Sequence, residues 1–480
     1  MMVIGKLWRN ASAIQRCLLI AGSAVAALAI VFTTLIAIEL VAYRAINTPA
    51  MPSNGVNITD KKQLLAQGEY LAKLGNCAAC HTARGGEAFA GGKAIHTPFG
   101  AVFASNITPD AEHGIGSWSA DAFYRAMKHG VSASGRLLTP AFPYTNYTHI
   151  SRADSDALHA YFLAGVKAVA QPSKAHELGF PFNTQFALAV WRVLFFNAAD
   201  GFNAPKNVAL AADSVPANPS KSIKNRTDFD AVERGQYLVQ GLGHCSACHA
   251  QRNALGAASA DGLLSGALMP MQDWYAPSLH AKEEAGVQHW PREQIVAFFK
   301  NGTTHNASAL GPMAEVVAKS TQFWHDEDLN ATAAYLQSLA VHTAPKKPQA
   351  QIAERSLDKG AALYAQHCAT CHGADGQGVR ELDAQSAQNP LSPALLIPAL
   401  AGNRAVSLSS SANLVRIILA GGYAPATQGN PRPYGMPPFV HVLSDEEIAF
   451  VTTYIRASWG NQANAVSGSE VVAQRRGVLQ

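Results

Sequence analysis

The residues most clearly suited to chemistry form a pattern, Cys-x-x-Cys-His, that occurs three times in the 480-residue chain. Its members are Cys77, Cys80 and His81, then Cys245, Cys248 and His249, then Cys368, Cys371 and His372. Two thiols at this spacing can form thioethers with the vinyl groups of a porphyrin, and the adjacent histidine can bind the iron. A random order of the same residues would give roughly 0.004 such matches. We therefore predict three covalently bound haems.

Zinc binding and disulfide bonding would use the cysteines differently. Zinc needs Cys and His pairs that converge on one metal, whereas these motifs lie far apart in the chain. Six of the 7 cysteines belong to the motifs, and Cys17 lies alone in an apolar stretch. No pair is left for a disulfide.

Two methionines follow the motifs at the distance expected of a second iron ligand. Met313 and Met436 each lie 64 positions after a motif histidine (249 to 313 and 372 to 436) in loops rich in Gly and Pro. A thioether opposite histidine raises the haem potential and closes the iron to other ligands. We predict that both bind iron.

The first motif departs from this rule. The corresponding loop carries Phe142, which cannot bind iron. Either another residue takes the position or the first haem is five-coordinate. Met127 is the nearest candidate for the missing ligand, and the alternative for Met127 is a core residue against the haem. His129 could also reach, although on a helix it faces roughly 160° away from such a core position.

Repeated helices must position these motifs. An amphipathic pattern with one glycine (Gly68, Gly235 or Gly360) precedes each motif, and a later helix carries an aromatic residue (Tyr161, Tyr335 or Tyr454). A glycine opposite an aromatic residue lets two helices cross closely. In the last of these helices, Ser444 and Glu447 predict a capping box. Trp118 and Trp290 each precede a short helix that reaches Gly130 or Gly302.

The N-terminal region predicts a membrane anchor. Residues 17–38 are uncharged and long enough to cross about 30 Å of hydrocarbon. Lys6, Arg9 and Arg16 precede them, so the N-terminus is expected in the cytoplasm and the remainder outside. A cleaved signal peptide is the alternative, although its apolar core would normally be shorter.

The predicted fold is all-α, with an N-terminal transmembrane helix followed by three cytochrome c-like domains. The expected boundaries are an anchor (1–43), domain 1 (59–170), an aromatic-rich connector (171–227), domain 2 (228–342), a linker (343–355), domain 3 (356–461) and an extended tail (462–480). The connector gathers its aromatic residues at 180–202. We expect either a helix that caps the groove between two haem domains or a surface that rests on the bilayer or lines a quinone entry.

From Gly68 to Asn461 the chain resembles the three-haem cytochrome c subunits of bacterial membrane-bound dehydrogenases. The resemblance includes Thr97-Pro98-Phe99-Gly100, Ser105-Asn106-Ile107-Thr108-Pro109-Asp110, His244-Cys245-Ser246-Ala247-Cys248-His249 and Gly311-Pro312-Met313-Ala314-Glu315. It implies that a separate catalytic subunit oxidises an aldehyde, alcohol, gluconate or fructose. Electrons would then pass through the three haems to ubiquinone in the bacterial inner membrane, with the haem domains in the periplasm. The Phe142 loop and the anchor favour a partner of the molybdenum aldehyde or N-heterocycle dehydrogenase kind, and they allow for a small iron–sulfur subunit as a second partner.

Two other classes of function stay open. The first is a peroxidase-type haem enzyme that uses haem 1, although peroxide cleavage needs a polar distal residue, which Phe142 does not provide. The second is a haem subunit of a terminal oxidase. A formal net charge of only +4, without a basic run, argues against nucleic acid as a partner.

Overall fold

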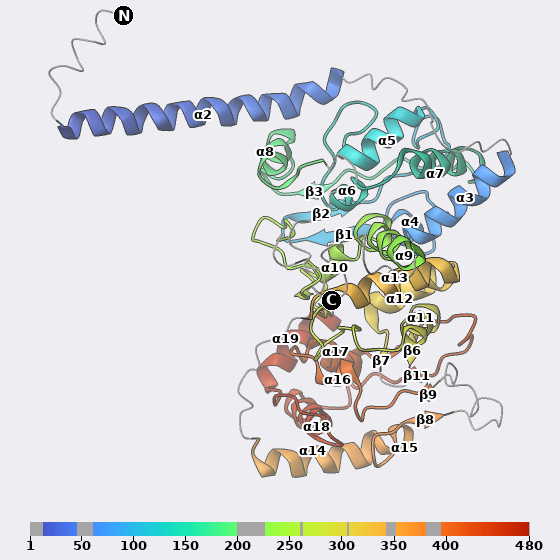
Figure 1. Cartoon of the computed structure of the whole chain (residues 1–480). Coiled ribbons are helices and arrows are strands. Elements are labelled where there is room, and N and C mark those ends of the chain that lie inside the picture. Colours follow the sequence, from blue (N-terminus) through green and yellow to red (C-terminus); the bar gives the residue numbers. More distant parts are fainter. Residues whose placement is uncertain are drawn as a thin grey trace, which may run out of the picture.

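The computed structural model describes residues 13–45, 61–198, 226–259, 263–304, 307–341, 352–380 and 395–479. Most of them lie in helices, and the strands are short (Figure 1). We call the segments around the three motifs the first unit (61–178), the second unit (226–341) and the third unit (352–479). The chain is mostly helical rather than purely helical, because each unit also contains short paired strands.

The helices divide among the units as follows. The first unit contains α3 (Lys61–Leu74), α4 (Cys77–His81), α5 (Ala120–His129), α6 (Tyr144–Tyr147) and α7 (Arg152–Ala164). The second contains α9 (Arg226–Gln236), the π-helix η1 (Tyr237–Leu242), α10 (Ser246–His249), α11 (Arg292–Asn301), α12 (Gly311–Lys319), the 3-10 helix η3 (Thr321–Phe323) and α13 (Asp326–Ser338). The third contains α14 (Glu354–His367), α15 (Ala369–His372), α16 (Arg404–Ser407), α17 (Ala412–Ala420), α18 (Asp445–Ala457) and α19 (Gly468–Leu479). Outside the units lie α2 (Ala13–Ala45) and α8 (Gln185–Phe195).

The strands pair in antiparallel fashion within each unit. The first unit has one three-stranded sheet of β1 (Ala94–Thr97), β2 (Gly100–Phe103) and β3 (Glu177–Leu178), in that order. The second has two pairs, β4 (Ala267–Leu268) with β5 (Tyr275–Ala276) and β6 (Thr303–Thr304) with β7 (Ala307–Ser308). The third pairs β8 (Val379–Arg380) with β9 (Leu395–Ile397) and β10 (Gly422–Tyr423) with β11 (Gly435–Met436).

One helix crossing recurs in all three units: α3 with α7, α9 with α13, and α14 with α18. A Cβ atom built on the predicted glycine would meet a carbonyl oxygen of the partner helix. The distances are 2.1 Å (Gly68 to Ala157), 2.0 Å (Gly235 to Ala331) and 2.4 Å (Gly360 to Phe450). The Cβ atoms of Tyr161, Tyr335 and Tyr454 lie 2.5, 2.7 and 2.6 Å away. The predicted pairing of a glycine with an aromatic residue is confirmed.

The predicted helix ends are also confirmed. Gly130 and Gly302 follow α5 and α11 in the left-handed region, at φ 61° and 75°, where glycine carries no steric penalty. Ser444 and Glu447 form the predicted capping box at the start of α18.

The C-terminal region differs from the expected extended tail. Helix α19 packs against α17 and α18, and Val471 is fully buried. Ser467 and Glu470 exchange the hydrogen bonds of a capping box at its start. Arg475 forms an ion pair with Asp445, at 2.5 Å between Nε and Oδ1. The capping pair and the buried valine explain why these residues form a helix.

The first and second units meet through a polar cluster. The Arg234 guanidinium donates to both carboxylate oxygens of Asp328, at 2.8 and 3.0 Å. Tyr70 of the first unit donates its hydroxyl to the same carboxylate at 2.5 Å and stacks on His325, with 3.9 Å between ring centroids. This cluster fixes α3 against α13.

The third unit docks on the second through paired hydrogen bonds. Tyr275 N donates to Asn413 Oδ1 at 2.8 Å, and Asn413 Nδ2 donates to Tyr275 O at 2.7 Å. Arg404 donates to the Gly286 carbonyl at 2.6 Å, and its guanidinium lies over Trp290. The expected linker 343–355 lies largely outside the described residues.

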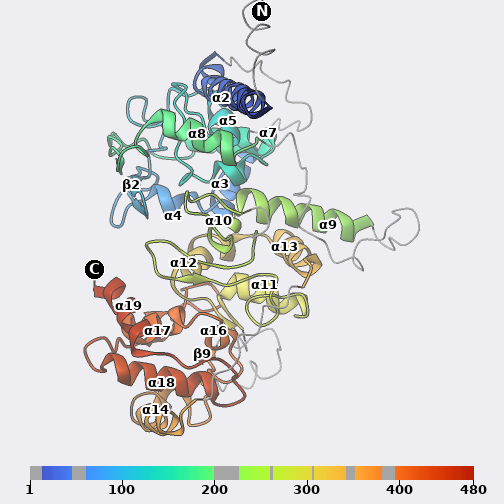
Figure 2. The same ribbon diagram turned by 90° about the vertical axis from the view of Figure 1, so that its left-hand side faces the viewer.

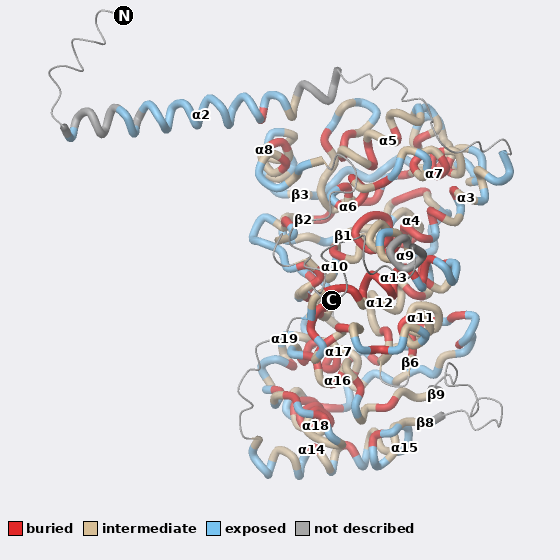
Figure 3. The backbone as a smooth tube through the Cα atoms, viewed as in Figure 1, coloured by how far each residue is buried: buried red, intermediate tan, exposed pale blue. Residues whose placement is uncertain are grey.

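Helix α2 stands away from the units for most of its length (Figures 1 and 3). By length and composition, Ser23–Leu40 could cross a membrane. Near its C-terminal end, Ile36 is buried against Val131, Leu137 and Ala189. Helix α8 lies across this end of α2 (Figure 2).

An ion pair joins α8 to α2. Arg192 of α8 is fully buried, and its Nε lies 2.7 Å from Glu39 Oε2 of α2. Trp191 of the same helix donates its indole N–H to the Leu255 carbonyl in the second unit, at 2.9 Å. The connector helix therefore links the N-terminal helix to the second unit.

Candidate functional site

Each Cys-x-x-Cys-His motif forms a short helical turn, in α4, α10 and α15. The chain enters the first two turns through left-handed residues, Asn76 at φ 52° and His244 at φ 40°. Positions i and i+3 of a helix lie on one face, so the two thiols of each motif point the same way. In all three motifs the first cysteine (Cys77, Cys245, Cys368) is half-buried and the second (Cys80, Cys248, Cys371) is exposed.

The three motif histidines share one hydrogen bond. Nδ1 of His81, His249 and His372 lies 2.7, 2.7 and 3.1 Å from the carbonyl oxygens of Ser105, Pro277 and Pro398, respectively. A histidine that donates Nδ1–H to a carbonyl keeps Nε2 for a metal and has a fixed ring orientation. These carbonyls follow the strands β2, β5 and β9, so the strands have a structural role that sequence reasoning missed. The only signal in the sequence is that each carbonyl residue follows its motif histidine at a similar distance, 24, 28 and 26 positions.

Burial also shifts the pKa of the motif histidines and of several motif cysteines. It lowers the pKa of His81, His249 and His372, although each carbonyl bond partly opposes the shift, and the imidazoles stay neutral as ligation requires. Burial also raises the pKa of Cys77 and Cys245 to about 12. Such thiols are poor thiolate ligands and poor nucleophiles.

The chemistry of the donor set fits haem c at each motif better than zinc. Across the described ranges, no group of three or more His, Cys, Asp or Glu side chains could hold a metal ion. Each motif instead offers two neutral thiols and one oriented imidazole.

The two predicted distal methionines lie in different kinds of element. Met313 lies in the first turn of α12, and Met436 ends β11. Both side chains are half-buried. Met436 and Cys368 both pack against the core cluster of the third unit. Helix α12 packs on α11 and also on α4 of the first unit.

The distal region of the first unit is apolar. Met127 is buried on α5, in the core cluster that also includes Cys77 and Phe142. Its counterparts in the other units, Phe299 and Ile418, also pack in cores. The Phe142 ring contacts Tyr147, with 5.3 Å between centroids.

The structure also brings the first and second motifs close together. Burial raises the pKa of Cys248, and the nearby Cys80 raises it further, against the effect of Arg252. Asn146 donates to the Ser246 hydroxyl inside the second motif, at 2.7 Å. Tyr147 lies against His244, with 5.7 Å between ring centroids. No pattern in the sequence indicated this contact, because the residues are about a hundred positions apart.

Comparison with known proteins shows that the chain is similar to cytochromes c. Residues 357–459 match the cytochrome c family. The chain is 36% identical to the cytochrome c subunit of alcohol dehydrogenase (quinone) from Gluconobacter oxydans, over 85% of this chain and 81% of the relative. It is 36% identical to the gluconate 2-dehydrogenase cytochrome c subunit from Pantoea cypripedii, over 86% and 89%. It is also 35% identical to a nicotinate dehydrogenase subunit from Pseudomonas putida, over 82% of this chain but 30% of that longer relative.

Proposed function

Because the chain belongs to the family of cytochrome c subunits of membrane-bound, quinone-linked dehydrogenases, we propose that it carries three haems c and relays electrons from a catalytic subunit to a membrane quinone. Bound haem supplies reversible one-electron chemistry, and the protein sets its position and potential. The observation that carries the count of three is the repeated bond from Nδ1 of each motif histidine to a backbone carbonyl.

The proposed ligands follow from the motifs. Cys77, Cys80, Cys245, Cys248, Cys368 and Cys371 would hold the porphyrins, and His81, His249 and His372 would bind the irons through Nε2. Met313 and Met436 are the proposed distal ligands of the second and third haems. The shared cluster of Met436 and Cys368 supports the latter.

For the first haem we propose Met127 as the distal ligand. It lies in the same cluster as Cys77, and a thioether there would protect the iron from oxygen. Met127→Leu nearly conserves volume, so the fold should lose less than about 1.5 kcal/mol. Ligand-field spectra should then show one haem turning high-spin. Unchanged spectra would mean that Met127 is only a core residue.

We propose that α2 is retained as a single span of the bacterial inner membrane, with the three units in the periplasm. Lys6, Arg9 and Arg16 before the apolar segment support this orientation. The buried Arg192 supports retention, because cleavage of α2 would remove the carboxylate of Glu39 from it. N-terminal sequencing of the mature protein tests this proposal, and a start near residue 45 would refute it.

The partner that we propose is a dehydrogenase catalytic subunit. The relatives carry the names of enzymes for an alcohol, gluconate and nicotinate at nearly equal identity. We infer that the catalytic subunit, and not this chain, determines which organic substrate is oxidised. A molybdenum-type catalytic subunit, of the aldehyde or N-heterocycle dehydrogenase kind, stays a prediction.

Mass spectrometry of the intact chain tests the haem count. Thioether linkages survive denaturation, so the mass should exceed that of the apoprotein by three haems, and one band should stain for haem on a denaturing gel. Replacing the two cysteines of one motif by alanine should remove one haem. A wild-type mass corresponding to two or four haems would refute the proposal.

A further inference from the structure

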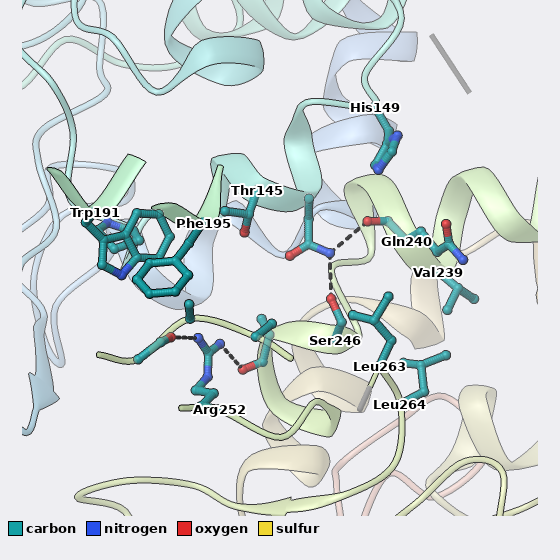
Figure 4. A pocket seen from close by; sticks show the side chains of 16 residues that line it. Thr145, His149, Trp191, Phe195, Val239, Gln240, Ser246, Arg252, Leu263 and Leu264 are labelled. Carbon is teal, nitrogen blue, oxygen red and sulfur yellow. Dashed lines mark hydrogen bonds between the residues drawn. The ribbon is translucent and has the colours of Figure 1, made fainter. Parts of the chain in front are cut away.

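A cavity of about 170 Å³ lies between the first unit, α8 and the second motif (Figure 4). The first unit contributes Thr145, Asn146 and His149, and α8 contributes Trp191 and Phe195. The second unit contributes Arg252 and the two residues between the motif cysteines, Ser246 and Ala247. A molecule in this cavity would therefore lie against the turn that carries Cys245 and Cys248.

The lining combines aromatic rings with a few polar groups. Trp191 and Phe195 contact each other, with 5.6 Å between centroids, and offer faces on which a flat ring can stack. Arg252 brings a positive charge, and its hydrogen bonds to the carbonyls of Ala247 and Gly256 hold it in place. Aromatic and apolar walls that carry a few placed polar groups are typical of small-molecule sites.

Asn146 has a fixed orientation at the cavity wall. It is 8% exposed, and Nδ2 donates to both the Gln240 carbonyl and the Ser246 hydroxyl, at 2.8 and 2.7 Å. These two bonds use both amide hydrogens, which leaves Oδ1 as an acceptor. Thr145 and His149 can donate. Burial is the main cause of a lowered pKa at His149, so this imidazole is neutral and can exchange a proton.

Helix α8, which contributes to the cavity wall, also carries exposed apolar side chains. Phe186 and Leu194 of α8 are 61% and 51% exposed, and Phe195, at 36%, stands at the cavity. Helix α8 lies across the end of α2 in Figure 2, and Ala189 of α8 shares a core cluster with Ile36 of α2. A helix with exposed apolar side chains can lie at the boundary between lipid headgroups and acyl chains.

We propose that this cavity binds the ring of a membrane quinone, with its prenyl tail lying along the exposed face of α8 toward the bilayer. The inference rests on the proposed function, which supplies the acceptor class and the electrons. Conversion of the quinone to the quinol takes up two electrons, delivered singly by the relay, and two protons from water. The two C=O π bonds are reduced, two O–H bonds form, and the ring becomes aromatic.

The wall residues suit both forms of the ligand. The quinone carbonyls accept hydrogen bonds from Thr145 and His149, whereas a quinol hydroxyl donates to Asn146 Oδ1. The positive charge of Arg252 stabilises the negative charge that develops on the quinone oxygens when electrons arrive. Trp191 and Phe195 hold the ring against the second motif.

A photoreactive azidoquinone tests the location directly. The full-length haem-loaded chain, purified in detergent, is irradiated with this probe, and the labelled peptides are identified by mass spectrometry. Label is expected in segments 140–149, 191–195 or 246–258. The affinity for a short-chain ubiquinone is measured in parallel by calorimetry.

Two variants alter the cavity at exposed positions, where folding should be unaffected. Phe195→Ala removes a stacking ring and should raise the quinone Kd about tenfold. Thr145→Trp fills the cavity and should prevent labelling. Phe323→Ala removes a comparably exposed aromatic ring that does not line the cavity, at 47% exposure, and should bind quinone like the wild type.

Label confined to other segments, or wild-type affinity in both cavity variants, would overturn the inference. Electron transfer from dithionite-reduced chain to ferricyanide should be the same in all variants. If the chain carries haems and reduces ferricyanide but the cavity is not labelled, only the quinone site is wrong. If the chain carries no haems, the proposed function itself is wrong.

Discussion

The close crossing of α9 and α13 predicts a large effect for the smallest possible substitution, Gly235→Ala. The added Cβ would lie 2.0 Å from the Ala331 carbonyl oxygen and 2.7 Å from Tyr335 Cβ. Ordinary contacts begin at 3.4 Å, so the helices would have to separate by about 1.4 Å. The carbonyl belongs to a helix and can move only with it.

The expected magnitude is the balance of two effects. Overpacking of this kind costs about 1–3 kcal/mol, and a backbone obstacle favours the upper half of that range. Replacing glycine by alanine in a helix returns about 1 kcal/mol of intrinsic stability. The net loss is about 1–2 kcal/mol, and each kcal/mol should lower the unfolding midpoint by about 2–8 °C.

Thermal unfolding of the full-length haem-loaded chain, followed by circular dichroism and by Soret absorbance, provides the measurement. Gly468→Ala is the matched control, because its Cβ would meet only Glu446 Cγ at 3.8 Å. The control should unfold at or slightly above the wild-type midpoint. If Gly235→Ala is as stable as the control, the two helices do not cross at this separation and the reasoning fails.

The remaining predictions concern the anchor, the distal ligands and acid stability. Glu39→Gln leaves the buried Arg192 without its carboxylate, which should cost about 3–5 kcal/mol and free α8 for proteolysis; equal protease resistance would contradict this. Met313→Ala and Met436→Ala should each lower the potential of one haem and let its iron bind carbon monoxide, and an intact ferric-thioether absorption band in both would count against these ligands. Burial alone would raise the pKa of Asp328, but hydrogen bonds from Arg234 and Tyr70 lower it below the ordinary value. The stabilisation by ionised Asp328 is therefore present above pH about 4 and is lost as the pH falls through the lowered pKa. Asp328→Asn should unfold at a lower temperature than the wild type at pH 7, and its unfolding midpoint should fall less than that of the wild type on acidification.

Much of the local architecture could be predicted from the sequence. The capping box at Ser444 and the helix ends at Gly130 and Gly302 depend on residues a few positions apart, and the glycine before each motif could be recognised because it recurs in all three repeats. Helix geometry converts such spacing directly into a shared face or a terminated turn. The same local reasoning failed at residues 462–480, where the short capping pair at Ser467 was overlooked and α19 was expected to be extended.

Residue types and their spacing were sufficient to identify the chemistry: three pairs of thiols, each with an adjacent histidine, and the helices that present them. The folded chain was needed to show which carbonyl orients each histidine, that Asn146 reaches Ser246, that Arg192 meets Glu39 and that a cavity lies beside the second motif. The physical reason is the range of the interactions. Spacing within a motif follows from the covalent chain and the helical repeat, whereas these contacts join segments separated by 24 to 153 positions. Their partners are backbone carbonyls and common polar side chains, which carry no recognisable pattern until packing brings them together.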